Sequence, residues 1–124
     1  MRNNIKIFIY LIFLSIFFSL FSKAEEIPYL LTASSKGDVE MVKAIIESGA
    51  NPNTRDKDNI TALMYASRKN QVEIVQYLIS KGAAINKTER DGWTALMFAT
   101  KKNYTDTISV LLANGADPKI TDPD

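Results

Sequence analysis

A 33-residue period is the sequence feature that most limits the fold of this chain. The thirteen residues from Asp58, DNITALMYASRKN, recur from Asp91 as DGWTALMFATKKN. The same register places a degraded copy upstream and divides the chain into three rows at about 27–59, 60–92 and 93–124. A fixed period of this length is typical of repeat architectures, in which similar small units stack on one another.

Each row begins with the pattern of a short capped helix. Thr61 and Thr94 precede the runs ALMYA and ALMFA, where a threonine side chain can cap a helix by accepting a backbone N–H. We expect the apolar residues of this run to face inward, because they lie about one helical turn apart. The helix should end at a column of residues that tolerate the left-handed conformation, namely Gly37, Asn70 and Asn103.

A second helix and a projecting loop complete each row. Apolar residues return at helical spacing between Val72 and Ile79, and Gly82 is a candidate C-cap. The loop then reaches a turn signal at Asp58-Asn59 or Asp91-Gly92. Two short helices cannot bury their apolar faces alone, so neighbouring rows must stack. The pattern predicts an all-α solenoid of three helix-turn-helix repeats with short β-hairpin-like loops.

The repeat resembles the ankyrin repeats. The resemblance rests on the period of 33, the T-x-L-x-x-A start and the ending Gly82-Ala83-Ala84-Ile85-Asn86, and it covers about residues 27–124. The chain departs from the family pattern in several columns. The proline after the threonine is Ala62 or Ala95, the histidine is Met64 or Met97, Pro28 replaces the first capping threonine, and Lys119 replaces the asparagine of the other rows.

The third row carries polar residues in its second helix. Thr105 and Thr107 stand where the other rows have valine and either methionine or isoleucine. A terminal repeat turns one face to water, so this exchange predicts a polar cap on the C-terminal end of the stack.

Residues 1–24 differ from the rest and resemble a secretory signal peptide. Arg2 and Lys6 precede a 15-residue apolar run at 7–21, and Ser22-Lys23-Ala24 has the small residues of a cleavage site. The alternative is an uncleaved membrane anchor, but a helix of that length spans only about 22 Å of a hydrocarbon layer of about 30 Å. We therefore expect an exported protein, periplasmic or secreted, whose repeat domain is residues 25–124.

The composition excludes most catalytic chemistry. The chain has no histidine and no cysteine, which removes the usual general base, the common catalytic triads and the common zinc sites. No phosphate-binding glycine motif is present. The acid pairs Asp56/Asp58 and Glu89/Asp91 are interpreted as solvated turn residues. We expect neither an enzyme nor a cofactor, metal or small-molecule substrate.

Charge argues against a nucleic-acid partner. Removal of residues 1–24 leaves 12 basic and 14 acidic residues, a net charge of −2. A domain of this charge is a poor candidate for general nucleic-acid binding. A membrane would be a partner only if the N-terminal segment stayed attached, and we expect a monomer.

The ankyrin resemblance implies a protein partner held by the loop tips and by the exposed side of the first helices. Applied to this chain, the resemblance selects three sets of residues: the loop tips, the positions just before the first helix of each row, and the column of basic residues near the end of that helix. These candidate residues are Lys57, Asp58, Ile60, Arg68, Lys69, Arg90, Asp91, Trp93, Lys101 and Lys102.

Two features of these candidates bear on the partner. Trp93, the single tryptophan, is either an aromatic anchor for a partner or a packing residue on the neighbouring loop, and the two roles are compatible. The basic column, which also includes Lys36, is offset by an acidic column at Glu40, Glu73 and Asp106. If the basic column faces the groove, it would steer an acidic partner.

The resulting hypothesis is an exported, non-catalytic protein-interaction module. Similar exported bacterial ankyrin proteins include ones thought to assist or neutralise a periplasmic enzyme or toxin, and others that act on host proteins. The alternative is a membrane-tethered ankyrin scaffold that keeps its N-terminal segment as an anchor.

Overall fold

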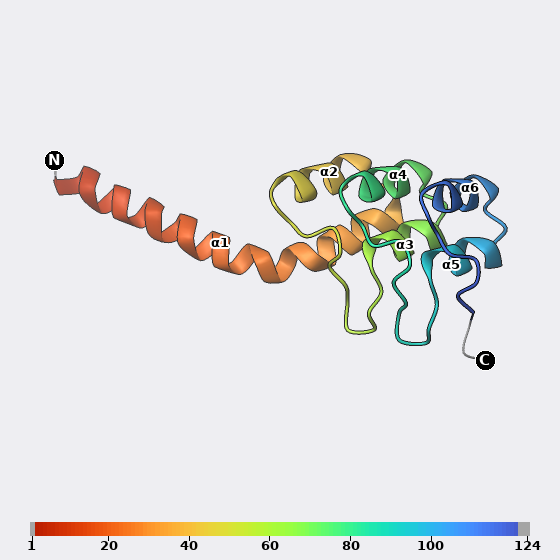
Figure 1. Cartoon of the computed structure of the whole chain (residues 1–124). Coiled ribbons are helices and arrows are strands. Elements are labelled where there is room, and N and C mark those ends of the chain that lie inside the picture. The colour runs from red at the N-terminus through yellow and green to blue at the C-terminus, as the bar shows by residue number, and fades with distance from the viewer. Residues whose placement is uncertain (1, 122–124) are drawn as a thin grey trace.

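The chain folds entirely into helices and loops where it is described. The computed structural model describes the backbone of residues 2–121 and the side chains of residues 4–16 and 28–121. Its helices are α1 (Arg2–Lys36), α2 (Val39–Glu47), α3 (Ala62–Arg68), α4 (Val72–Ser80), α5 (Ala95–Lys101) and α6 (Thr105–Ala113). The loops that precede α3 and α5 project to one side of the helices (Figure 1).

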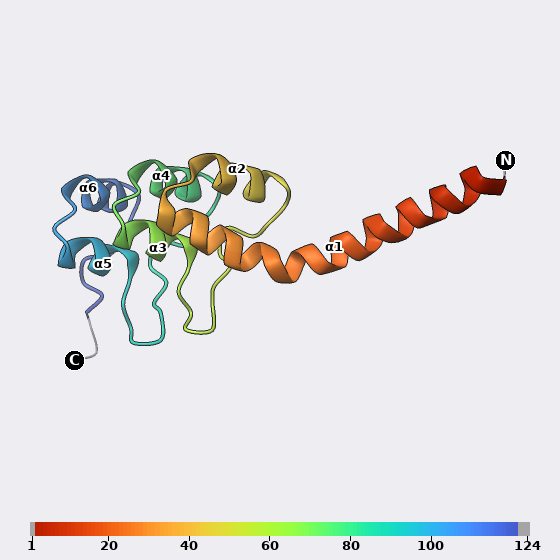
Figure 2. The same ribbon diagram turned by 180° about the vertical axis from the view of Figure 1, so that it is seen from behind.

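The helices stack as three antiparallel pairs in two layers. The end of α1 packs on α3 and α3 packs on α5, while α2, α4 and α6 form the second layer (Figure 1, Figure 2). One apolar cluster runs through all three pairs. Its fully buried members include Leu30, Val42, Leu63, Leu78 and Leu111. The predicted all-α solenoid of stacked helix pairs is confirmed.

The predicted helix boundaries are confirmed at the column residues. Thr61 Oγ1 accepts the Met64 N–H at 3.3 Å, and Thr94 Oγ1 accepts the Met97 N–H at 3.2 Å. Asn70 and Asn103, at the turn after the first helix, both have φ of 56°, and Gly37 has 83°. The left-handed turn lets the second helix fold back against the first, so one residue per repeat sets the pairing of the two layers.

Polar side chains join successive repeats through their loops. Asn53 Oδ1 accepts the Ala84 N–H at 2.7 Å, and Asn53 Nδ2 donates to the Gly82 carbonyl at 3.1 Å. Asn86 repeats both bonds one repeat later, to the backbone of Asp117 and Gly115. Each asparagine therefore satisfies the backbone groups that the next repeat exposes where its second helix ends. We call these two sets of bonds the asparagine ladder. The ladder stops at Lys119, which stands in the position of Asn53 and Asn86 in the third repeat.

The first repeat does not begin with the short, separate helix that its register predicts. Pro28 lies inside α1, which is continuous from Arg2 to Lys36. The first row lacks the capping threonine that starts the helix in the other two, so no cap interrupts the helix upstream. The cleavage site predicted after Ala24 falls on residues of which only the backbone is described. The side chain of Ile27, the residue before the predicted helix, also lies outside the described residues.

The upstream part of α1 makes no contribution to the described core. Apolar side chains between Ile5 and Ile16 are exposed, and the buried residues of α1 begin at Leu30. Within the part of the chain that the structure describes, no helix combines the length and the apolar character that a bilayer crossing requires.

The polar cap predicted in the third row is wrong for one of its two residues. Thr105 is exposed, but Thr107 is fully buried and donates to Asn70 Oδ1 at 2.7 Å. The reason is orientation, because this helix position faces the preceding repeat. Met41, the corresponding residue of the first repeat, has no repeat before it and is 46% exposed. Thr107 thus belongs to an interface between repeats.

The asparagine ladder makes a prediction about stability. Asn53→Ala removes two bonds between repeats and should lower the free energy of unfolding by about 1–2 kcal/mol. Gln76→Ala, an exposed substitution on α4, should change it by less than about 0.5 kcal/mol. Urea unfolding followed by circular dichroism measures both. Equal stabilities for the two variants would show that the ladder does not hold the repeats together.

Candidate functional site

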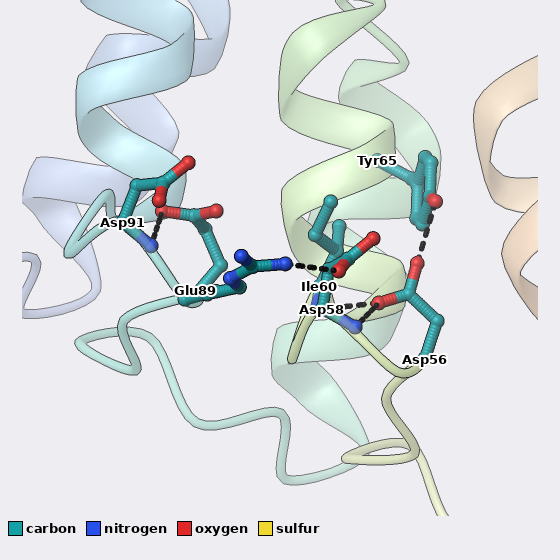
Figure 3. A network of polar contacts seen from close by, with 7 residues as sticks. Asp56, Asp58, Ile60, Tyr65, Glu89 and Asp91 are labelled. Atoms are coloured by element: carbon teal, nitrogen blue, oxygen red, sulfur yellow. Dashed lines mark hydrogen bonds and ion pairs between the residues drawn. The ribbon is translucent and has the colours of Figure 1, made fainter.

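Two carboxylates organise the projecting loops. Asp56 Oδ1 accepts the N–H groups of Asp58 and Ile60 at 2.9 and 3.0 Å (Figure 3). Glu89 Oε1 accepts those of Asp91 and Trp93 at 2.8 and 2.9 Å. Their interpretation as solvated turn acids is therefore wrong for Glu89, which is only 8% exposed. Both carboxylates shape the turn because one oxygen of each binds two successive backbone donors.

The second oxygen of each carboxylate has a different environment. Asp56 Oδ2 accepts the hydroxyl of Tyr65 at 2.7 Å. Burial, followed by this hydrogen bond, raises the pKa of Tyr65 above its ordinary value of 10.0. In the third repeat the residue that corresponds to Tyr65 is Phe98, which has no hydroxyl. Among the described residues, none donates a hydrogen bond to Glu89 Oε2.

Cationic and aromatic side chains alternate across the face of α3 and α5. The guanidinium of Arg68 lies 5.8 Å from the ring centre of Tyr65 and 5.3 Å from that of Phe98. The rings of Phe98 and Trp93 are 5.2 Å apart, and Lys101 Nζ lies 4.9 Å from the Trp93 ring. These distances fall within the range of cation–π attraction. The series holds long basic side chains in place on a surface that spans two repeats.

A depression of about 550 Å³ opens beside this series. Its lining residues are Arg68, Lys69, Glu89, Asp91, Trp93, Phe98, Lys101 and Lys102. Four basic and two acidic side chains leave a net charge of +2. The acidic column predicted behind the groove begins α2, α4 and α6, and none of its residues is among this lining. Six of the ten predicted site residues thus lie at one concave surface.

The other four predicted site residues lie elsewhere. Lys57 is exposed at a loop tip, and Ile60 packs at the edge of the core. Asp58 and Arg90 bind each other across neighbouring loops, with Asp58 Oδ1 3.4 Å from Arg90 Nη1. The Arg90 N–H also donates to the Asp58 carbonyl at 3.0 Å. This pair links two repeats and is engaged within the protein.

Trp93 is half-buried between two sets of neighbours. It packs on Phe98 of its own repeat, and it also lines a second, more apolar depression of about 430 Å³ beside Pro118 and Ile120. Trp93 can therefore both pack within the repeat domain and contact a partner. The Phe98 ring is tilted by 37° to the Trp93 ring, and Lys101 lies over the Trp93 ring as well.

Sequence reasoning missed Glu89 and Phe98 as residues of the site. The signal was present in the columns, because the pair Asp56 and Tyr65 changes to Glu89 and Phe98 between the second and third rows. The third repeat therefore keeps the loop carboxylate but has no tyrosine hydroxyl to bind its second oxygen. Without the fold, nothing showed that these two columns meet.

The comparison with known families agrees with this architecture. A family model described as ankyrin repeats (3 copies) matches residues 30–122. The chain belongs to the ankyrin-repeat family. Ankyrin-repeat domains are typically non-catalytic modules that bind other proteins. No curated protein matches the chain significantly. Among the described residues, this ankyrin domain has no cluster of three or more acidic side chains that could hold a metal ion.

The Tyr65–Asp56 contact of this ankyrin domain predicts a pH-dependent stability. The folded state holds the neutral phenol more strongly than the unfolded chain does, because the pKa is raised. The contribution of Tyr65 is therefore complete below pH 10 and is lost as the pH rises through the folded-state pKa. Tyr65→Phe should cost about 1 kcal/mol near neutral pH, and the difference from the parent protein should shrink above about pH 10.

Urea unfolding at about pH 7 and about pH 11 measures this difference. Tyr29→Phe is the matched control, since Tyr29 is 60% exposed and should be neutral at both values. A Tyr65→Phe effect of the same size at both pH values would contradict the assignment.

Proposed function

We propose that this protein is an exported ankyrin-repeat module that binds an acidic segment of a protein partner in the concave surface between its second and third repeats. The observation that carries the proposal is the depression lined by Arg68, Lys69, Lys101 and Lys102 around the aromatic ring of Trp93. Four cations from two successive repeats meet there although the repeat domain as a whole is slightly acidic.

The energetics of this surface suit recognition more than stability. Four like charges around one depression repel one another, and only two acids in the lining offset them. An acidic partner would relieve that repulsion and would be steered toward the surface, which raises the association rate most strongly at low salt. Trp93 offers a partly exposed aromatic side chain of the kind that contributes most to binding energy. The cation–π contacts limit the side-chain entropy that binding must remove.

Export is supported by how the chain is organised around residue 24. The described side chains of residues 4–16 are exposed, whereas the buried residues begin at Leu30. Cleavage after Ala24 would remove the apolar segment and leave every described core residue in place. A signal segment with this property could be lost without cost to the repeat stack.

The binding surface is tested by reversing its charge. Lys101→Glu/Lys102→Glu should reduce recovery of the partner about tenfold or more when the tagged protein is purified from its own compartment, because two of the four cations at the depression change sign. Lys81→Glu/Lys119→Glu makes the same change of charge at exposed positions outside the depression and should leave recovery unchanged. Equal recovery with both double variants would exclude this surface as the binding site.

The N-terminus is tested on the native protein. Intact mass spectrometry of the protein from its own cells should give a chain that begins at Glu25, since the small residues before it favour cleavage there. A mass that includes Met1 would contradict export by a cleaved signal and would favour the tethered alternative.

A further inference from the structure

The third repeat leaves one carboxylate oxygen at the depression without a donor among the described residues. Glu89 is 8% exposed and lines the depression, and its Oε1 already accepts two backbone N–H groups. No described residue donates to its Oε2. Glu89 Oε2 is not among the buried unpaired atoms of the described residues, so water can reach it in the free protein. A partner that covers the depression must therefore supply a donor in place of that water, because a charged oxygen left without one is costly.

The second repeat shows which donor fits such an oxygen. There the Tyr65 hydroxyl donates to Asp56 Oδ2 at 2.7 Å, and the carboxylate holds its loop through the same two backbone bonds as in the third repeat (Figure 3). In the third repeat Phe98 occupies the tyrosine position. Glu89 Oε2 therefore lacks the hydroxyl donor that its counterpart Asp56 Oδ2 has, and Glu89 lines the depression together with the rings of Trp93 and Phe98.

The remaining lining narrows the chemistry of the donor. Lysine and arginine side chains would meet four cations around the depression. A serine or threonine hydroxyl would leave the rings of Trp93 and Phe98 uncovered, whereas a phenol can pack against aromatic rings and donate at its far end. A phosphorylated phenol would bring a second anion against Glu89.

We propose that the depression receives an unmodified tyrosine side chain from an acidic segment of the partner, with its hydroxyl donating to Glu89 Oε2 and its ring packed against Trp93 and Phe98. The inference rests on the proposed function and adds the residue that the surface selects. The basic residues attract the segment, and Glu89 discriminates among the side chains it carries.

The test compares three synthetic acidic peptides that differ only at their centre. Each has acetylated and amidated ends, with tyrosine, phenylalanine or phosphotyrosine flanked on both sides by aspartate and glutamate. Binding to the purified protein is measured by calorimetry and by the fluorescence of Trp93, the single tryptophan. The tyrosine peptide should bind about tenfold more tightly than the phenylalanine peptide, as a hydrogen bond to a charged group implies. The phosphotyrosine peptide should also bind more weakly than the tyrosine peptide.

A variant that gains a hydroxyl distinguishes the hydrogen bond to Glu89 from non-specific binding of an aromatic peptide. Phe98→Tyr reproduces the pair found in the second repeat and should satisfy Glu89 from within the protein. The preference for the tyrosine peptide over the phenylalanine peptide should then disappear. Tyr65→Phe is the matched control, because it removes the corresponding hydroxyl outside the depression, and it should keep the preference.

The outcomes distinguish this inference from the proposed function. If the tyrosine and phenylalanine peptides bind equally to the parent protein, the tyrosine pocket is wrong and the binding of an acidic segment to the depression stands. The same conclusion follows if the phosphotyrosine peptide binds most tightly, or if Phe98→Tyr keeps the preference. If none of the three peptides binds at millimolar concentration, the groove assignment and the tyrosine pocket both fail.

Discussion

Burial of apolar surface between neighbouring helix pairs is the interaction on which the rest of the structure depends. Helices of seven or nine residues, such as α3 and α4, are too short to be stable alone in water. Leu63, Val75 and Leu78 are almost completely buried because repeats on both sides cover them. Stability in such a stack is the sum of repeat and interface contributions, so each interface must form for the loops to hold their positions.

Polar contacts then fix how one repeat sits on the next. The Asn53 and Asn86 ladder, the Asp58–Arg90 pair and the bond from Thr107 to Asn70 all cross between repeats. None of them supplies a core, but each joins a fixed position of one repeat to a fixed position of the next. The depression lies where α3, α5 and their loops pack side by side. The proposed binding surface is therefore a property of an interface between repeats.

The second and third repeats use the same kind of loop carboxylate but pair its second oxygen differently. Both use a carboxylate to hold the loop before the first helix, at Asp56 and Glu89. The second repeat satisfies the remaining oxygen internally with Tyr65, whereas the third has Phe98 at that place and Trp93 before its helix. A repeat fold tolerates such changes because the loop bonds come from backbone N–H groups, which survive most side-chain substitutions.

The sequence by itself determined the period, the helix caps and the left-handed turns, because these depend on local backbone chemistry at Thr61, Thr94, Asn70 and their columns. It also identified the basic column and Trp93, since a fixed period places like residues on one face. Only the tertiary structure decided which way a side chain points between repeats. Thr107 is buried because its helix packs against the preceding repeat, where it meets Asn70, and Glu89 is buried beside the depression that it shares with Arg68 and Lys69 of the preceding repeat. Burial is a property of neighbours, and the neighbours exist only in the stack.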